Sequence, residues 1–549
     1  MAQNQKATKK VDEVLPYLEG VAKNLVDRLY GPQGPAWGTK FTELEETVAA
    51  VRKTLTEKML HQALARQAAQ PERPPEYHRC PSCGQVPTPA AAAEPRCLEA
   101  SGGQAVWEEP KTRCQKCRRV FFPQSKSLGI DRSNYSPTLQ RKIVYAGIAH
   151  GSFEQGKQSL QELAEVEVTT KQVERLTRTI GNERAEERTA AVAAFEKLPL
   201  ADKHRTPDEV ASPEVAVVMV DGGRLQIRER GAAENTTTEE ETPAASGREK
   251  GKHWREDKAV LLLSVQSEVS AVDPCPEIPE TFVDPTRILK LARAIHAVSP
   301  GLDGVVDPQS ANPGVDETLT EATKYTPPEI VQREVVASRL RWPLFAVLVA
   351  QAARSAGLLG ALRRAFVADG SDNNWAIWQR FFGSWTPIID FIHVLSYIFA
   401  AATAGRPFAA GWPIYVRWIE WLWQGRVALV IAELAQRQAA LGTPEASDGE
   451  TSARRLVAAA LTYLQNHQGK MRYDEYRRQG LPITSSHMES LMKQINQRVK
   501  GSEKFWCENG AEAILQLRGD HLSDARPLDA FWERRQAKQT GQRNYAQAA

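Results

Sequence analysis

Two carboxylates stand in the sequence where a divalent metal ion could bind. Asp221 ends the apolar run VAVVMV, Asp369 ends the run AFVA, and a glycine follows each aspartate. A buried strand has no use for a carboxylate at its end unless positive charge is held there. Phosphodiester chemistry needs an activated attacking oxygen and a stabilised leaving oxygen, which two ions about 3.5 to 4 Å apart supply through hard anionic ligands. The aspartates therefore indicate metal-dependent phosphodiester chemistry.

The third acid of such a site is expected on a helix beyond the strands. Glu489 in TSSHMES is the candidate, because Thr484 or Ser485 can cap a helix that carries this carboxylate in its first turns. The alternative is that Glu489 belongs to a solvated helix face. Three basic residues on this helix or just past it are predicted to hold a DNA backbone against the site: Lys493, Arg498 and Lys500.

Four of the 7 cysteines form two Cys-x-x-Cys pairs, in CPSCG and CQKC. Each pair can aim two thiolates at one ion, so together they predict a tetrahedral structural zinc site in a zinc ribbon. The ligands would be Cys80, Cys83, Cys114 and Cys117. The stretch AAAAEPRCLEASGG between the pairs is expected to loop out. Cys97 in that loop and His78 before the first pair are alternative ligands, and free buried thiols are the remaining alternative.

Two short helices, GKQSLQELAEV and TTKQVERLTRTIG, suit a helix-turn-helix. Thr169 or Thr170 would cap the second helix. Its basic residues would be available to a major groove: Lys171, Arg175 and Arg178. A small helical bundle with a solvated basic face is the alternative, and the neighbouring zinc ribbon favours DNA binding.

The periodicity changes from helix to strand after about residue 205. VAVVMVDGGRLQIRE is expected to form a strand, a bend at Asp221, and a second strand, and KAVLLLSVQSEV a third. Residues 327–364 are expected to be helical, and AFVADG to form a fourth strand. Three strands, a helix and a strand, with acids ending the first and fourth strands, is the order of a ribonuclease-H-like core, where those strands are neighbours. The polar stretch at 230–257 is expected to be a mobile loop.

The sequence therefore predicts a multidomain α/β protein, as its length of 549 residues requires. The predicted parts are a helical region (1–75), a zinc ribbon (76–125), a helix-turn-helix region (126–205), a ribonuclease-H-like core (206–395), an all-α insertion (396–470), C-terminal core helices (471–525) and a disordered tail (526–549).

The order of VVMVDGG, FVADGSDNNW, DFIHVLSY and GLPITSSHMESLMKQINQRVKGSEKFW resembles that of bacterial insertion-sequence transposases of the DDE class, most closely the Kra-type group. The resemblance covers roughly residues 120 to 520. It implies that Asp221, Asp369 and Glu489 are the catalytic acids and that Mg²⁺ or Mn²⁺ is their metal. It also implies a helical insertion between the second and third acids, as in Mutator and hAT transposases.

Asp390 and His393 match the Asp/Cys-x-x-His motif that these transposases share. By the resemblance, the pair supports the site and does not ligate metal directly. The alternative is a buried polar pair that closes the start of a helix.

These features predict a transposase that binds the terminal repeats of its insertion sequence, then cleaves and joins DNA. Water would attack first to free a 3′ hydroxyl, and that hydroxyl would then attack target DNA. The partners would be double-stranded DNA, as transposon ends and target, and at least one further copy of the chain, because two ends are handled together. The alternatives are a catalytically silent, transposase-derived DNA-binding protein and a ribonuclease-H-like structure-selective nuclease.

Bulk properties add little to this prediction. A net charge of +3 does not by itself indicate nucleic acid. The first residues lack the apolar core of a signal peptide, and Arg354, Asp390 and His393 interrupt the two most apolar segments. We expect no membrane partner and a location in the bacterial cytoplasm, in association with the nucleoid.

Overall fold

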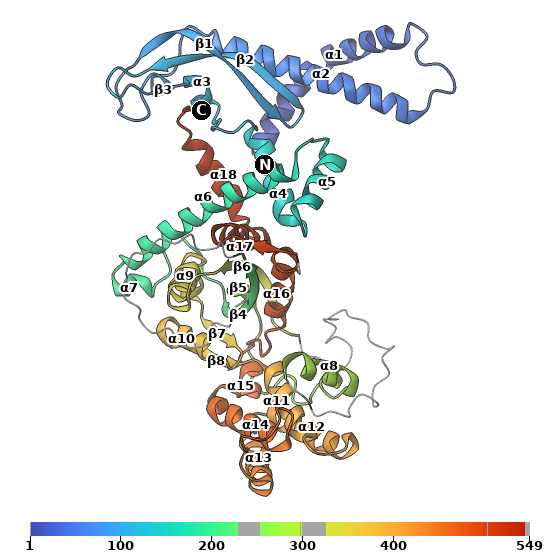
Figure 1. The fold of residues 1–549 in the computed structure, drawn as a ribbon, viewed down its shortest axis with the longest axis vertical. Helices are drawn as coiled ribbons and strands as arrows, with labels where there is room; N and C mark the ends of the chain where they lie inside the picture. Colours follow the sequence, from blue (N-terminus) through green and yellow to red (C-terminus); the bar gives the residue numbers. More distant parts are fainter. Residues whose placement is uncertain (1, 229–252, 297, 299–325, 502, 544–549) are drawn as a thin grey trace. The chain divides into compact units, whose positions relative to one another are not determined.

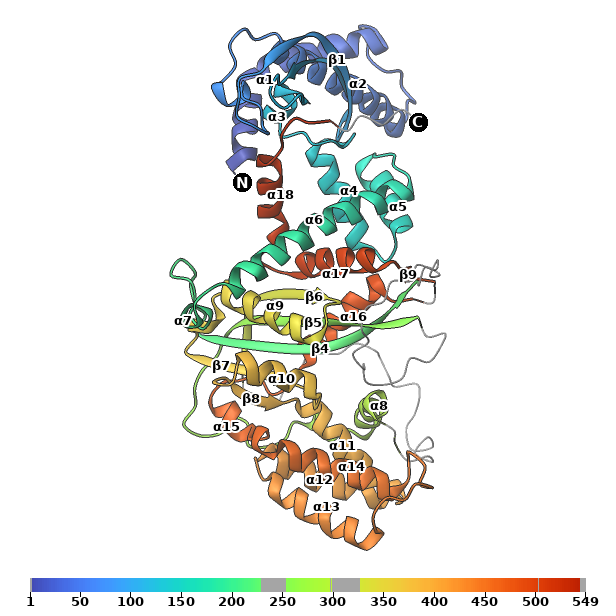
Figure 2. The ribbon, with the colours of Figure 1, turned by 60° about the vertical axis from the view of Figure 1, so that its left-hand side comes forward.

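The computed structural model describes residues 2–228, 253–296, 298, 326–501 and 503–543. They form two compact units (Figures 1 and 2). Unit 1 contains residues up to 141 and from 534 onwards, and unit 2 contains residues 142–533. The loop predicted at 230–257 lies outside the described residues as far as residue 252. Within the described part of the chain, none of the helices has the length and apolar character needed to cross a membrane.

Unit 1 consists of two long helices followed by a small antiparallel sheet of order β1-β2-β3. Its elements are α1 (Ala2–Tyr30), α2 (Phe41–Ala68), a 3₁₀ helix (Pro75–Tyr77), β1 (Thr88–Ala100), β2 (Gly103–Arg113), β3 (Val120–Phe121) and α3 (Pro123–Ser127). The helices predicted before residue 75 are therefore confirmed.

The expected loop between the cysteine pairs is instead a β-hairpin. β1 pairs with β2 from Thr88 opposite Arg113 to Ala100 opposite Gly103. Alternate residues of β2 are buried, and Trp107 packs with Leu98 and the α2 residue Leu64. Side chains alternate between the two faces of a strand, so Leu98 faces this cluster and its neighbour Cys97 faces solvent.

Unit 2 opens with helices that include the predicted pair. These are α4 (Pro137–Ala149), which begins before residue 142, α5 (Phe153–Ala164), α6 (Thr170–Glu196) and α7 (Leu200–Lys203). α5 ends at Glu165 in the left-handed region (φ 53°), and Thr169 caps α6 in a capping box with Gln172. The two predicted helices and the Thr169 cap are confirmed, although α6 extends well beyond the predicted segment.

The sheet of unit 2 has six strands in the order β6-β5-β4-β7-β8, and β9 pairs with the far end of β4. The strands are β4 (Val215–Ile227), β5 (Trp254–Gln266), β6 (Glu329–Ser338), β7 (Arg363–Ala368), β8 (Thr386–Ile389) and β9 (Phe505–Trp506). β6, β5 and β4 are antiparallel neighbours, whereas β7 is parallel to both β4 and β8.

The four segments that were expected to form strands all lie in the sheet. Two other predictions for this region, a bend and a helix, are wrong. β4 does not bend at Asp221: it continues to Ile227, with Gly222 opposite Lys258 and Gly223 opposite Asp257. The strand β6 occupies the start of the region 327–364, which was predicted to be helical. β6 pairs along its length with β5 alone, and its first half is largely exposed, so its apolar residues do not follow a clear strand pattern.

Most of the remaining helices pack around this sheet or lie beyond its β8 edge (Figure 1), and the last of them, α18, continues past residue 533 into unit 1. They are α8 (Pro285–Ile295), α9 (Trp342–Ser355), α10 (Asp372–Phe381), α11 (Phe391–Thr403), α12 (Phe408–Trp423), α13 (Val427–Leu441), α14 (Ala453–His467), α15 (Tyr473–Arg478), α16 (Ser486–Val499), α17 (Glu508–Leu522) and α18 (Pro527–Ala537). Short 3₁₀ helices lie at Glu280–Phe282, Leu358–Gly360 and Gln468–Lys470. The helices predicted at 396–470 are present as α11 to α14.

α9 and α16 lie on opposite faces of the sheet (Figure 1). Trp342 of α9 is on the side of Gly222, and Met492 of α16 is on the side of Gly223. Since side chains alternate along a strand, Asp221 shares the α16 side with Gly223. The sheet therefore presents its first predicted acid to the helix that carries Glu489.

The prediction of a disordered tail is wrong for residues 527–537. They form α18, and Phe531 and Trp532 are buried against apolar side chains such as Ile180 and Leu517. The tail prediction missed this aromatic pair.

Candidate functional site

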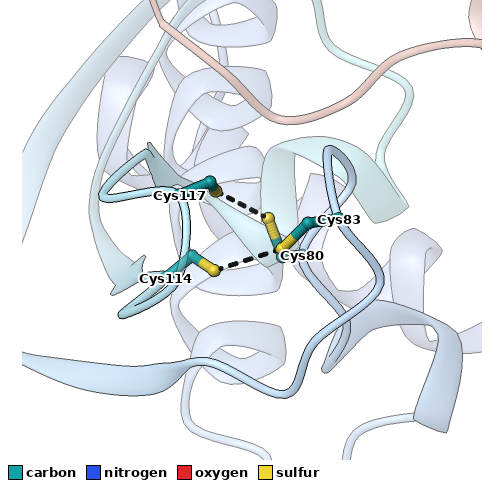
Figure 3. A group of neighbouring side chains, drawn as sticks. All are labelled: Cys80, Cys83, Cys114 and Cys117. Atoms are coloured by element: carbon teal, nitrogen blue, oxygen red, sulfur yellow. Dashed lines mark hydrogen bonds between the residues drawn. The ribbon is translucent and has the colours of Figure 1, made fainter.

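The four predicted cysteines converge in unit 1 (Figure 3). The Sγ atoms of all four lie within 4.8 Å of one another. Cys80 Sγ is 3.5 Å from Cys117 Sγ, and Cys83 Sγ is 3.4 Å from Cys114 Sγ. The four thiols form a candidate zinc site, and neither His78 nor Cys97 belongs to the group.

Two similar turns aim these thiols at one point. The N–H of Cys80 donates to Gln85 O at 2.8 Å, and that of Cys114 donates to Arg119 O at 2.9 Å. The residue after each pair is left-handed: Gly84 has φ 72° and Arg118 has φ 57°. The backbone N–H of Cys117 is the main cause that lowers the pKa of the Cys114 thiol to about 6, which favours the thiolate that binds metal.

Strand register brings the two predicted aspartates together in unit 2. Met219 of β4 pairs with Val367 of β7, so two residues further along both parallel strands Asp221 stands beside Asp369. Ala368 pairs with Ile389 of β8, which places Asp390 one position past the next strand. Asp369 and Asp390 thus directly follow the carboxyl ends of β7 and β8, and Asp221 lies beside them within β4.

Asp369 is held by its own turn and by β4. Its Oδ1 accepts hydrogen bonds from Ser371 N at 2.9 Å and from Asn374 Nδ2 at 2.8 Å. Asn374 Nδ2 also donates to Val220 O at 3.3 Å, the carbonyl immediately before Asp221. Asn374 therefore ties one aspartate to the backbone of the other. The sequence analysis assigned no role to Asn374, although it lies in FVADGSDNNW.

The space beside Gly370 is filled by a tyrosine ring. A Cβ at this position would lie 2.4 Å from the Tyr463 ring, which is stacked on Tyr397 with centroids 3.9 Å apart. The glycine therefore makes room for an aromatic side chain of the helical insertion.

Asp390 connects the sheet edge to the helix of the third acid. It caps α11, where its Oδ2 accepts from His393 N at 3.1 Å and lies 2.6 Å from His393 Nδ1. Its Oδ1 accepts from Ser485 N, the N-cap residue of α16, at 2.7 Å. Because both oxygens of this fully buried carboxylate are engaged, the geometry favours support over direct metal ligation.

Glu489 lies in the first turn of α16, one turn past that contact. Its charge acts on both Asp221 and His393, so the helix places it near the aspartates. Its carboxylate accepts no hydrogen bond from any described residue. Lys493, one turn further along, is exposed and its charge also acts on Glu489.

The acids repel one another, and a histidine offsets the repulsion. Burial, then the charges of Asp369 and Glu489, raise the pKa of Asp221 to about 6, against the lowering effect of Gly222 N–H and His393. Burial lowers the pKa of His393, but the hydrogen bond and charge of Asp390 outweigh it and, with the other acids, raise it to about 9. A protonated imidazole therefore sits among the carboxylates at neutral pH.

The free oxygens suit a hard divalent cation. Asp221 Oδ1 accepts from Gly222 N at 2.7 Å and Asp369 Oδ1 is engaged, which leaves one oxygen of each aspartate and the Glu489 carboxylate. Anionic oxygens of this kind are the ligands of Mg²⁺ and Mn²⁺. Among the described residues, only the cysteines form a group whose ligand atoms all lie within 4.8 Å, so the three acids are neighbours at a longer range.

The predicted DNA-binding residues differ in solvent exposure. Lys171, Arg175, Lys493 and Lys500 are exposed, and Arg178 is half-buried beside Glu174. Arg498 is buried, and its Nε donates to Gly147 O at 3.0 Å. It therefore differs from the other predicted DNA-binding residues in being buried.

Asp257 is a further acid that the sequence analysis did not single out. It stands opposite Gly223, on the same side of the sheet as Asp221, and it is fully buried. Neither of its oxygens accepts a hydrogen bond from another described residue. Burial is the main cause that raises its pKa to about 6, against its own N–H and the charges of Lys258 and Lys500. The sequence feature that could have identified Asp257 is its position directly before the largely apolar run KAVLLL.

No family model matches this chain, and no curated protein matches it. The assignment of these two sites therefore rests on the residues and their geometry.

The cysteine cluster predicts stoichiometric zinc. The purified chain should contain about one zinc ion, measured by elemental analysis, because four thiolates complete a closed tetrahedral shell. Cys114→Ser should lose most of the zinc and lower the melting temperature, whereas Cys97→Ser should keep both. Full zinc content in Cys114→Ser would contradict the assignment.

Asp257 predicts a pH-dependent cost to stability. Its folded pKa of about 6 exceeds the ordinary value of about 3.9, so the folded state binds the proton more tightly and loses stability as pH rises from 4 through 6. Asp257→Asn should therefore be roughly 2 to 3 kcal/mol more stable than the unsubstituted chain at pH 8, with little difference at pH 4.

Urea unfolding followed by tryptophan fluorescence at both pH values measures this difference. Asp12→Asn, an exposed change on α1, is the control and should show none. Loss of stability in Asp257→Asn at pH 8 would show that the buried carboxylate has a partner in solution.

Proposed function

We propose that this protein is a DNA transposase that uses Asp221, Asp369 and Glu489 for metal-dependent strand cleavage and strand transfer. The observation that carries the proposal is the register of β4 and β7, which sets the two aspartates side by side on the face that α16 covers. The third acid is one turn into that helix.

The sheet order supports a ribonuclease-H-like core. Numbered along the chain, the five main strands lie in the order 3-2-1-4-5, with the first three antiparallel and the last two parallel to the first. The helices α11 to α14 fall between the second and third acids, as the resemblance to Mutator-like and hAT-like enzymes implies.

The three acids would hold Mg²⁺ or Mn²⁺, which when bound polarises the phosphodiester and lowers the pKa of an attacking water. Asn374 fixes the orientation of Asp369, and Asp390 fixes the start of α16 through Ser485. His393 contributes positive charge beside the carboxylates. These contacts pre-position the ligands, so little reorganisation is needed when DNA arrives.

Recognition of the transposon ends is assigned to the helical pair α5 and α6 and to the cysteine-containing unit. Lys171 and Arg175 are exposed in the first turns of α6, where a recognition helix contacts a groove. Lys493 and Lys500 on and after α16 would contact DNA phosphates near the acids.

A second copy of the chain is the partner that fits the exposed face of α2. Phe41, Val48, Leu55 and Met59 are spaced by seven, seven and four residues, which puts them on one helix face. They are 72%, 61%, 42% and 60% exposed. The charges along α2 are also self-complementary, because its first half is acidic and its second half is largely basic: Glu43, Glu45 and Glu46 against Arg52, Lys53 and Lys58. Antiparallel pairing of two α2 helices would bring these halves together.

Asp221→Asn tests the chemistry. A plasmid carrying the element's own ends should be cleaved by the unsubstituted chain with Mg²⁺ and should yield joined product, whereas the variant should bind the same DNA and cleave it about 100-fold or more slowly. Without metal the variant should melt at a higher temperature, because one repelling carboxylate is removed, and Mn²⁺ should stabilise it less.

The products separate the alternatives. Cleavage without joined product would identify a structure-selective nuclease, and binding without cleavage by the unsubstituted chain would identify a catalytically silent DNA-binding protein. Asp12→Asn, on the exposed face of α1, serves as the matched control and should behave as the unsubstituted chain.

If a second copy binds the exposed face of α2, the chain should form a dimer whose population depends on concentration. Val48→Glu combined with Leu55→Glu should weaken association at least about tenfold, because a charge cannot be buried unpaired in an apolar interface. Sedimentation equilibrium measures the change, and Ala50→Glu combined with Thr54→Glu adds the same two charges at exposed positions on another face of α2 as a control. A dimer of undiminished affinity in the double variant would exclude this face.

A further inference from the structure

A pocket with a volume of about 260 Å³ lies in unit 2 at the end of α16, away from the three acids. Its walls come from the start of α5, from α6, and from the segment that runs through β9 into α17. Three cationic side chains line it: Arg178, Arg498 and Lys504. The volume is below that of pockets for drug-sized ligands, roughly 300 to 1,000 Å³, and suits a small group.

Arg498 is an unpaired buried cation in the pocket wall. Its side chain is 2% exposed, and its guanidinium lies 4.3 Å from the Phe153 ring centroid and 5.3 Å from that of Trp506. No carboxylate of a described residue forms an ion pair with it, and its Nη2 has no hydrogen-bond partner. Although burial lowers the pKa of Arg498 to about 10, the side chain stays charged at neutral pH. Such a group is costly unless an anion meets it.

Arg178 presents a second guanidinium to the same pocket. Its Nη1 is 3.3 Å from Glu174, but its Nε has no hydrogen-bond partner among the described residues. Gly510 in the first turn of α17 makes room for it, because a Cβ there would lie 3.3 Å from Arg178 Nε and 2.9 Å from Cys507 Sγ.

The two acids that line the pocket do not neutralise these cations fully. Glu174 is shared between Arg178 and Lys171, and Glu503 forms no ion pair with any residue in the described ranges. Ser152 caps the N-terminus of α5 at the pocket wall, which adds the positive end of a 12-residue helix. The site thus offers an anion two guanidinium groups and a helix terminus, whose N–H donors match phosphate.

We propose that this pocket binds one phosphate group of the DNA backbone, with Arg178 and Arg498 as its donors. The proposal rests on the proposed function. Arg178 belongs to α6, the candidate recognition helix, and Arg498 belongs to α16, the helix of Glu489. One phosphate would therefore join the helix that recognises DNA to the helix that carries a catalytic acid.

A purely structural role for Arg498 is the competing explanation, and Arg518 is the matched control. Arg518 is also buried and donates to the carbonyl oxygens of Ile148 and Gln494 at 3.0 and 3.1 Å. Both arginines thus cap the C-terminal end of α4. Arg518 does not line the pocket.

Inorganic phosphate is the first probe, titrated into the full chain by calorimetry. It should bind to the unsubstituted chain, and Arg178→Gln, a change in a half-buried side chain, should weaken binding at least tenfold. Arg498→Met, which keeps an unbranched side chain between the two rings, should do the same, while Arg518→Met should not. Absence of phosphate binding, or equal affinity in Arg178→Gln, would overturn the proposal.

Duplex DNA distinguishes a backbone phosphate from free phosphate. The slope of log affinity against log salt should fall by about 1 in Arg178→Gln if the pocket holds a backbone phosphate. Phosphate binding with an unchanged slope would assign the pocket to a free phosphate and overturn the backbone assignment. Asp221→Asn should keep both the phosphate affinity and the salt dependence of DNA binding. Loss of cleavage can therefore be distinguished from loss of phosphate binding in the pocket.

Discussion

The buried carboxylate of Asp390 is the contact on which the arrangement of the acids depends. It caps α11, orients His393 and accepts the N–H of Ser485 at the start of α16. Asp390 follows β8, the strand next to β7, so a single side chain links the sheet edge to the helix of the third acid. Removal of the His393 imidazole, its charged partner, would leave an unpaired charge in the core, a change that typically costs about 3 to 5 kcal/mol.

This arrangement concentrates negative charge on one side of the sheet. Asp221 and Glu489 both have raised pKa values, burial being the main cause, and Asp257 lies buried on the same side without a partner. A protein optimised for stability alone would not keep so many carboxylates here, whereas a site that binds divalent cations needs them. His393 supplies a countercharge among these acids, and the charge of Lys493 also acts on Glu489.

Much of this site could be predicted because its signals are local. Apolar runs that end in Asp-Gly located Asp221 and Asp369, and two Cys-x-x-Cys pairs located the four cysteines of the candidate zinc site. The errors have non-local causes. β6 gave no clear alternation because it is an edge strand. Asp221 and Gly222 suggested a bend, although their pairing with Ala259 and Lys258 continues β4 through this point. The roles of Asn374 and the buried position of Arg498 depend on elements far away in sequence, at Val220 and Gly147.

The proposed function requires Asp221, Asp369 and Glu489 to hold divalent ions. Anomalous diffraction from crystals of the chain soaked in Mn²⁺, with and without bound DNA, measures whether they do. A manganese peak is expected between the carboxylates of these three residues, and it should be lost in Asp221→Asn. No peak there in the DNA-bound crystals, or a Glu489 side chain turned away from both aspartates, would rule out this metal site.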